Sequence, residues 1–145
     1  MNETSNPLPF SQGNGEKGEK SDTSTSASTS AALTIRNIRI QEGLARFAGS
    51  MERYQHWLNE FITYGPAATA EIRRAISDEA HETATRLAHA LKGRTGMLGM
   101  VEPHAICLAL EMALKNGEPP SLWLEELEIS VQEMSKDITA ALKQN

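Results

Sequence analysis

The chain has 145 residues, a length that favours a single domain. Apolar residues make up 39% of it and aromatic residues 5%, which is enough for one compact core and too little for two. A net charge of −5 argues against a nucleic-acid-binding protein, because such proteins carry a basic stripe. The single cysteine excludes an internal disulfide and favours a reducing compartment. The apolar stretches are too short to cross a bilayer and the N-terminus lacks a signal-peptide pattern, so we expect a cytoplasmic protein without direct membrane insertion.

The first 32 residues contain no periodic apolar pattern, and eight of the ten positions from Ser21 to Ser30 are Ser or Thr. Such a stretch buries too little apolar surface to offset the entropy lost on ordering. We therefore expect a disordered tail or linker over residues 1–32, with a phosphorylated Ser/Thr switch as the functional alternative. One domain should follow over residues 33–145.

The domain should begin with two helices. Ile40, Leu44 and Phe47 predict a short helix that packs across one end. A longer helix follows, whose apolar stripe has three-four spacing and consists of Met51, Tyr54, Leu58, Phe61, Gly65, Ala68, Ile72 and Ile76. Gly65-Pro66 interrupts this stripe. Because proline removes an amide donor and clashes with the preceding turn, a kink or a short break is expected there.

Three more helices should complete the domain. Ser77 or Asp78 is expected to cap the first of them, which ends at Gly99 and has a stripe of Ala80, Ala84, Leu87, Leu91 and Leu98. Pro103 predicts the start of the next, with Gly117 as its stop and a stripe of Ala105, Leu108 and Met112. Ser121 is expected to cap the last, with a stripe of Leu124, Leu127, Val131, Met134, Ile138 and Leu142.

No segment alternates with a period of two, so no strand is predicted and the expected fold is all-α. Four long helices joined by short loops should pack as an antiparallel up-down-up-down bundle, with the short N-terminal helix as an addition.

His89 is the most informative residue of the chain. At 100° per residue, Leu87 and Leu91 each lie about 160° away from it, so a core position for the leucines places the imidazole in solvent. Gly93 and Gly96 lie within about 40° of its direction. Two further residues, Lys92 and Arg86, lie about 60° to either side.

The two glycines need an explanation, since each costs a helix about 1 kcal/mol relative to alanine. Without side chains there, another molecule can approach the ring closely. A neutral imidazole is a nucleophile, and Lys92 could hold an anion transferred to it. No carboxylate lies at i+3 or i+4 to make His89 a general base, so we favour phosphoryl acceptance over hydrolysis.

The segment His89-Ala90-Leu91-Lys92-Gly93 resembles the H-x-L-K-G signature of histidine-containing phosphotransfer (HPt) domains. The resemblance extends to residues 41–49 and to residues 110–114, and it covers roughly residues 38–142. It implies a phosphorelay intermediate of two-component signalling that takes a phosphoryl group from the aspartyl phosphate of one receiver domain and passes it to another. In this reading His89 is the phosphoryl acceptor, Lys92 is the electrostatic partner of the phosphoryl oxygens, and Gly93 opens the approach.

The resemblance also implies the partners. These would be response-regulator receiver domains and a hybrid histidine kinase, whose C-terminal part this chain could be; only then would it be associated with a membrane. Mg²⁺ would belong to the receiver, so no cofactor, and no kinase or hydrolase activity, is expected of this chain, which should be a monomer that binds no nucleic acid. Arg94 departs from the small residue common in the family, and together with Arg86 and Gly96 it is a candidate for partner binding.

Two other functions compete with phosphotransfer. A non-catalytic helical adaptor that binds a receiver or kinase stays open as the alternative. A hydrolase or metalloprotein has no support, because paired carboxylates and metal-ligand spacings are missing from the sequence. Basic residues near the histidine helix predict a mildly basic approach to His89; they are Arg73, Arg74, Arg86, Lys92 and Arg94.

Overall fold

The computed structural model describes residues 33–143, so the predicted disordered tail at 1–32 lies outside the described residues. The described part contains the helices α2 (Ile40–Ala45), α3 (Met51–Ser77), α4 (His81–Leu98), α5 (Val101–Lys115) and α6 (Ser121–Lys143). Residues 33–143 contain no strand, only one isolated bridge between Ile38 and Met100. The predicted all-α class is therefore confirmed. Every helix in this range is too short or too polar to span a bilayer.

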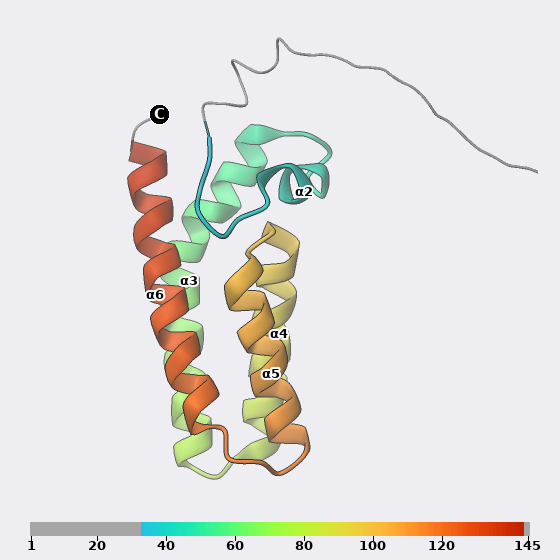
Figure 1. The fold of residues 1–145 in the computed structure, drawn as a ribbon, viewed down its shortest axis with the longest axis vertical. Helices are drawn as coiled ribbons and strands as arrows, with labels where there is room; N and C mark the ends of the chain where they lie inside the picture. Colours follow the sequence, from blue (N-terminus) through green and yellow to red (C-terminus); the bar gives the residue numbers. More distant parts are fainter. Residues whose placement is uncertain (1–32, 144–145) are drawn as a thin grey trace, which may run out of the picture. The chain divides into compact units, whose positions relative to one another are not determined.

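The four long helices lie side by side, and each packs against two others (Figure 1). α3 neighbours α6 and α4, and α5 neighbours α4 and α6, while the short α2 rests on α3 and α4. Their facing sides bury the largest apolar side chains, which include Tyr54, Leu58, Phe61, Ile72, Leu91, Leu98, Leu110, Leu127 and Ile138. Burial of each such side chain contributes about 1.5 to 3 kcal/mol, so the bundle core is the main source of stability.

α3 runs unbroken through Pro66, so of the predicted kink or short break the break is wrong, while the kink stays a prediction. The helix is closely packed at this point: a Cβ added at Gly65 would lie only 2.8 Å from Val131 on α6 and from Phe61. The hydroxyl of Thr69 donates to the Pro66 carbonyl at 2.9 Å. Burial on both sides of this point outweighs the single helical hydrogen bond that proline removes.

α4 begins later than predicted. Ser77 is still the last residue of α3, Asp78 follows as its C-cap, and the chain turns at Glu79 with a φ of 58°. Ala80 precedes α4 and offers no side-chain cap. The predicted stop is confirmed, because Gly99 ends α4 in the left-handed conformation with a φ of 79°.

α5 buries a different face from the predicted one. Leu108 and Met112 are 42% and 52% exposed, and Ala105 is exposed as well. The buried residues are Pro103, Cys107, Leu110, Glu111, Ala113 and Leu114. The run from 105 to 114 is apolar on nearly every side, so spacing alone could not choose its inner face. The face that packs inward carries Glu111 toward α4, where positive side chains meet it.

Candidate functional site

His89 stands on the outer side of α4. Its side chain is 65% exposed, while Ala88 and Leu91 are fully buried. Leu87, expected in the core, is only half-buried. The outward position predicted from the helical period is nevertheless what the structure shows, because Leu91 anchors the opposite side.

Glu111 on α5 is the functional candidate that the sequence reading missed. Its side chain is only 3% exposed, and its Oε2 lies 2.9 Å from Nδ1 of His89. Nζ of Lys115 lies 3.1 Å from the same oxygen, and Nζ of Lys92 lies 2.8 Å from Oε1. No carboxylate lies at i+3 or i+4 of His89, as the sequence shows, but this one reaches the ring from another helix, 22 residues further along the chain.

The three partners explain why a carboxylate can be buried here. Burial raises the pKa of the Glu111 carboxyl, but the contacts with Lys92, Lys115 and His89 and the charge of Lys92 outweigh burial and lower the pKa from 4.5 to about 2. Glu111 is therefore ionised at neutral pH. An unpaired buried carboxylate would cost several kcal/mol, on the order of 3 to 5 when one partner is removed.

The ionised carboxylate decides which nitrogen of His89 carries the proton. A carboxylate only accepts hydrogen bonds, so Nδ1 must donate to Oε2 of Glu111. In the neutral ring the lone pair then belongs to Nε2. The arrangement leaves the nucleophilic nitrogen on the side of the ring away from Glu111.

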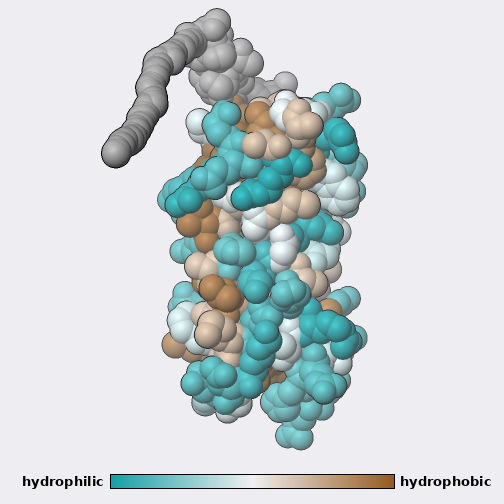
Figure 2. Space-filling model, turned by 90° about the vertical axis from the view of Figure 1, so that its right-hand side faces the viewer, coloured by the Kyte–Doolittle hydropathy of each residue, from teal (hydrophilic) through white to brown (hydrophobic). Residues whose placement is uncertain are grey.

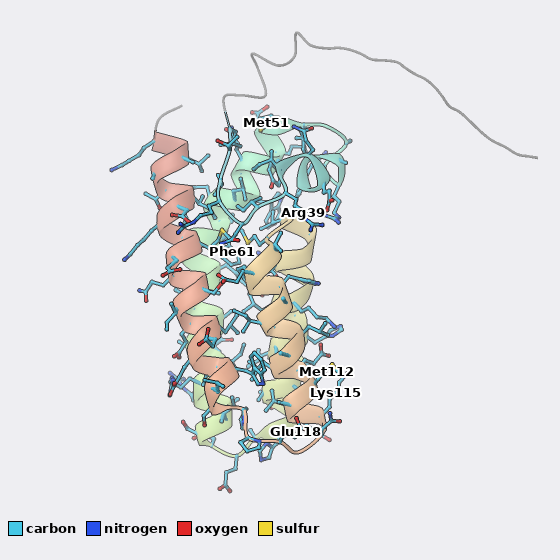
Figure 3. All side chains as sticks on the ribbon, in the orientation of Figure 1. Arg39, Met51, Phe61, Met112, Lys115 and Glu118 are labelled. Atoms are coloured by element: carbon cyan, nitrogen blue, oxygen red, sulfur yellow. The ribbon has the colours of Figure 1, made fainter. Side chains whose placement is uncertain are left out.

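Lys92 contacts Glu111 in the structure, and its role beside the phosphoryl oxygens stays a prediction. The sequence reading placed it beside the phosphoryl oxygens, but its side chain is only 23% exposed and its ammonium group is paired with Glu111. Oε1 of Glu111 accepts no aligned hydrogen bond from the described residues, so charge attraction dominates this contact. Lys115 is the more accessible cation, with 58% exposure. In Figure 3, Lys115 and Met112 project from α5 to the same side of the bundle.

The two glycines after His89 have different surroundings. A Cβ added at Gly93 would meet nothing within 4 Å, so nothing in the described chain requires a glycine there, and access remains the interpretation. A Cβ at Gly96 would lie 3.0 Å from the ring of His104. Nδ1 of His104 in turn lies 3.0 Å from the Lys92 carbonyl, to which it donates. Packing against His104 therefore explains Gly96, which was predicted to serve partner binding.

Two of the arginines predicted near the site are engaged elsewhere. The guanidinium of Arg94 lies over the rings of Tyr64 and Trp57 on α3, 4.1 and 5.2 Å from their centroids. Arg73 forms a bidentate pair with Glu128 on α6, at 2.7 and 2.8 Å. The basic approach to His89 is therefore narrower than predicted.

Arg86 remains on the His89 side. It lines an open groove of about 540 Å³ between α4 and α5, together with His81, His89 and Lys115. Arg86 and Lys115 thus bring two positive side chains to the groove that His89 lines.

In a comparison with known families, the Hpt domain matches residues 56–144, more than half of the chain. Comparisons with curated proteins and with solved structures give no match. The matched range includes α4, α5 and α6 and most of α3, and it leaves α2 outside.

Proposed function

We propose, from the premise that this chain belongs to the Hpt domain family, that it is a phosphorelay intermediate with His89 as its phosphoryl acceptor. Hpt domains take part in phosphotransfer in two-component signalling and interact with receiver domains and kinases. The finer proposal is that His89 takes the phosphoryl group from the aspartyl phosphate of one receiver and passes it to another. The observation that carries it is an exposed ring whose Nδ1 is bound by Glu111, so that Nε2 is left to react.

The transfer step follows from the proton positions. The Nε2 lone pair attacks phosphorus, the N–P bond forms, and the bond between phosphorus and the aspartyl oxygen breaks to release the receiver's carboxylate. Nδ1 keeps its proton, so the phosphorylated ring is a cation. Attack by the aspartate of a second receiver reverses each of these changes and restores the neutral ring.

Charged side chains around His89 can stabilise both the ring cation and the phosphoryl oxygens. Glu111 accepts the Nδ1 proton and stabilises the positive charge that develops on the ring. Lys92 acts through Glu111, because it holds the other oxygen of that carboxylate. Arg86 and Lys115 line the groove at the ring, and we assign them to the phosphoryl oxygens; Lys115 would exchange its 3.1 Å contact with Glu111 for this one.

An apolar strip beside the site offers a docking surface for the receiver. Val101, Leu108 and Met112 are 41%, 42% and 52% exposed. At 100° per residue they point within about 40° of one another along the outer side of α5. Figure 2 views the molecule from the right-hand side of Figure 1, where brown apolar patches alternate with hydrophilic residues. A mixed surface of this kind suits a transient complex.

We propose that the four long helices form an antiparallel up-down-up-down bundle, which the short connections at 78–80, 99–100 and 116–120 support. We further propose a cytoplasmic monomer that receives its phosphoryl group within a hybrid kinase pathway, with Mg²⁺ bound by the receiver and no cofactor of its own. The buried Cys107 accords with a reducing compartment.

The proposal is tested by mixing the chain with a receiver labelled at its aspartyl phosphate. Acid-labile, base-stable label should appear on the wild-type chain and be absent from His89→Gln. His56→Gln is the matched control, because His56 is 62% exposed and lies on α3. Equal labelling of His89→Gln would overturn the proposal. Binding of receivers without any labelling would instead favour the adaptor.

A further inference from the structure

We propose that the groove between α2, α4 and α5 selects the receiver, and that Arg39 and Arg46 there bind acidic side chains on the receiver's surface. This inference rests on the proposed function, since it requires a receiver to dock beside His89.

The groove begins next to the acceptor. It has a volume of about 610 Å³ and is lined by Gly93, Met97 and Val101, with Arg39 and Arg46 on its α2 side. Gly93 follows His89 by one helical turn, about 6 Å along the axis. Space beside Gly93 is open, so a protein seated on His89 can continue into the groove without meeting a side chain there.

The α2 side of the groove is positively charged on an acidic protein. The charged residues that line the groove on this side are Arg39, Arg46 and Glu42, an excess of one positive charge, whereas the whole chain has a net charge of −5. Arg39 is 64% exposed, and its ion pair within the described residues is a contact of 3.6 Å with the exposed Glu42. Such exposed pairs contribute little and are readily exchanged for a better partner.

Arg46 is also available to a partner. It is exposed, and its Nη1 lies 3.5 Å from the Met97 carbonyl, a long and weak contact. A guanidinium has five N–H donors and matches the geometry of a carboxylate. Two of them on one wall of the groove therefore favour an occupant with acidic side chains.

The wall that carries these arginines is rigidly attached to the bundle. The amide of Arg39 donates to the Gly99 carbonyl at 2.8 Å, and the amide of Val101 donates to the Asn37 carbonyl at 2.8 Å. The hydroxyl of Tyr54 donates to the Leu98 carbonyl at 2.7 Å, close against Gly43 of α2. Because this segment is already ordered, binding there loses less conformational entropy.

α2 lies outside the residues that match the family, which favours a role in choosing the receiver over a role in phosphoryl transfer. The match spans residues 56–144 and so contains His89 and Glu111, but it leaves out Arg39 and Arg46. Contacts made outside the shared region can separate one receiver from another without disturbing phosphoryl transfer.

The test compares single charge reversals with receivers that label the wild-type chain as the probe. We expect Arg39→Glu and Arg46→Glu each to raise the half-saturating receiver concentration by about fivefold or more, with the transfer rate at saturation within about twofold of wild type. Arg39→Lys and Arg46→Lys keep the charge but not the fork of donors, so each should lose less affinity than the matching charge reversal. Arg53→Glu is the control, since it makes the same charge change on the first turn of α3 without lining the groove.

Three results would overturn the inference while leaving the proposed function intact. Arg53→Glu could weaken docking as much as the groove variants do, which would indicate general electrostatic steering. The groove variants could dock normally, or they could lower only the rate at saturation. A wild-type chain that takes no label at all would refute the proposed function itself.

Discussion

Replacing Glu111 by glutamine removes one buried charge while keeping the size of the side chain. The folded-state pKa of about 2 against an ordinary value of 4.5 corresponds, at about 1.36 kcal/mol per unit, to about 3 kcal/mol of stability at neutral pH. His89 and Lys115 are 65% and 58% exposed, so water screens part of their attraction. We therefore expect Glu111→Gln to lower the free energy of unfolding by about 1 to 3 kcal/mol at pH 7.

The stability that Glu111 contributes should depend on pH. A carboxyl whose pKa is lowered by folding contributes its full stability above the unfolded value of 4.5 and loses it as the pH falls toward about 2. The difference between wild type and Glu111→Gln should therefore be constant from pH 7 to about 5.5 and shrink below that.

Urea unfolding followed by circular dichroism at pH 7, 5.5 and 3.5 measures this difference. Glu118→Gln, at an exposed position in the connection after α5 (Figure 3), should change stability by less than about 0.5 kcal/mol. A Glu111→Gln variant as stable as wild type at pH 7, or a difference that grows toward low pH, would refute the role assigned to the carboxylate.

Three further substitutions test the packing and the access around His89. Leu91→Ala, at a fully buried position, should lower the free energy of unfolding by about 2 to 5 kcal/mol in the same assay, and a loss below about 1 kcal/mol would contradict its place in the core. Gly93→Leu should leave stability unchanged or slightly raised but slow phosphoryl transfer, whereas an unchanged transfer rate would contradict the access argument. Gly96→Val should push the His104 ring from the Lys92 carbonyl and lower the free energy of unfolding by about 1 kcal/mol or more. In a protein that already carries His104→Ala, the same substitution should cost much less, because the ring it would displace is gone. Strictly additive losses in the double variant would contradict this packing.

Sequence reasoning succeeded where polar residues occupy the face opposite the core. The stripe predicted for α6 includes Leu124, Leu127, Val131, Met134 and Ile138, and all five are buried. The outward position of His89 and the stop at Gly99 follow from equally local rules, a helical period and a left-handed glycine. Neighbouring residues are sufficient to predict these features because one local arrangement is much more stable than its alternatives.

Other features depend on contacts between helices and so escaped prediction. Glu111 is buried only because Lys92 on α4 and two neighbours neutralise it, a property that no single helix shows. One signal was available: Glu111 follows Cys107 by four residues and precedes Leu114 by three, so it shares their buried face. The unbroken course of α3 at Pro66 likewise depends on how closely α6 packs against it.

The most direct test of the account is to determine which nitrogen takes the phosphoryl group. Phosphorus-31 and nitrogen-15 NMR of the labelled chain, after incubation with a phosphorylated receiver, should show phosphorus bonded to Nε2 of His89. The proton on Nδ1 should remain, held by Glu111. Phosphorus on Nδ1, or on a histidine other than His89, would contradict the account.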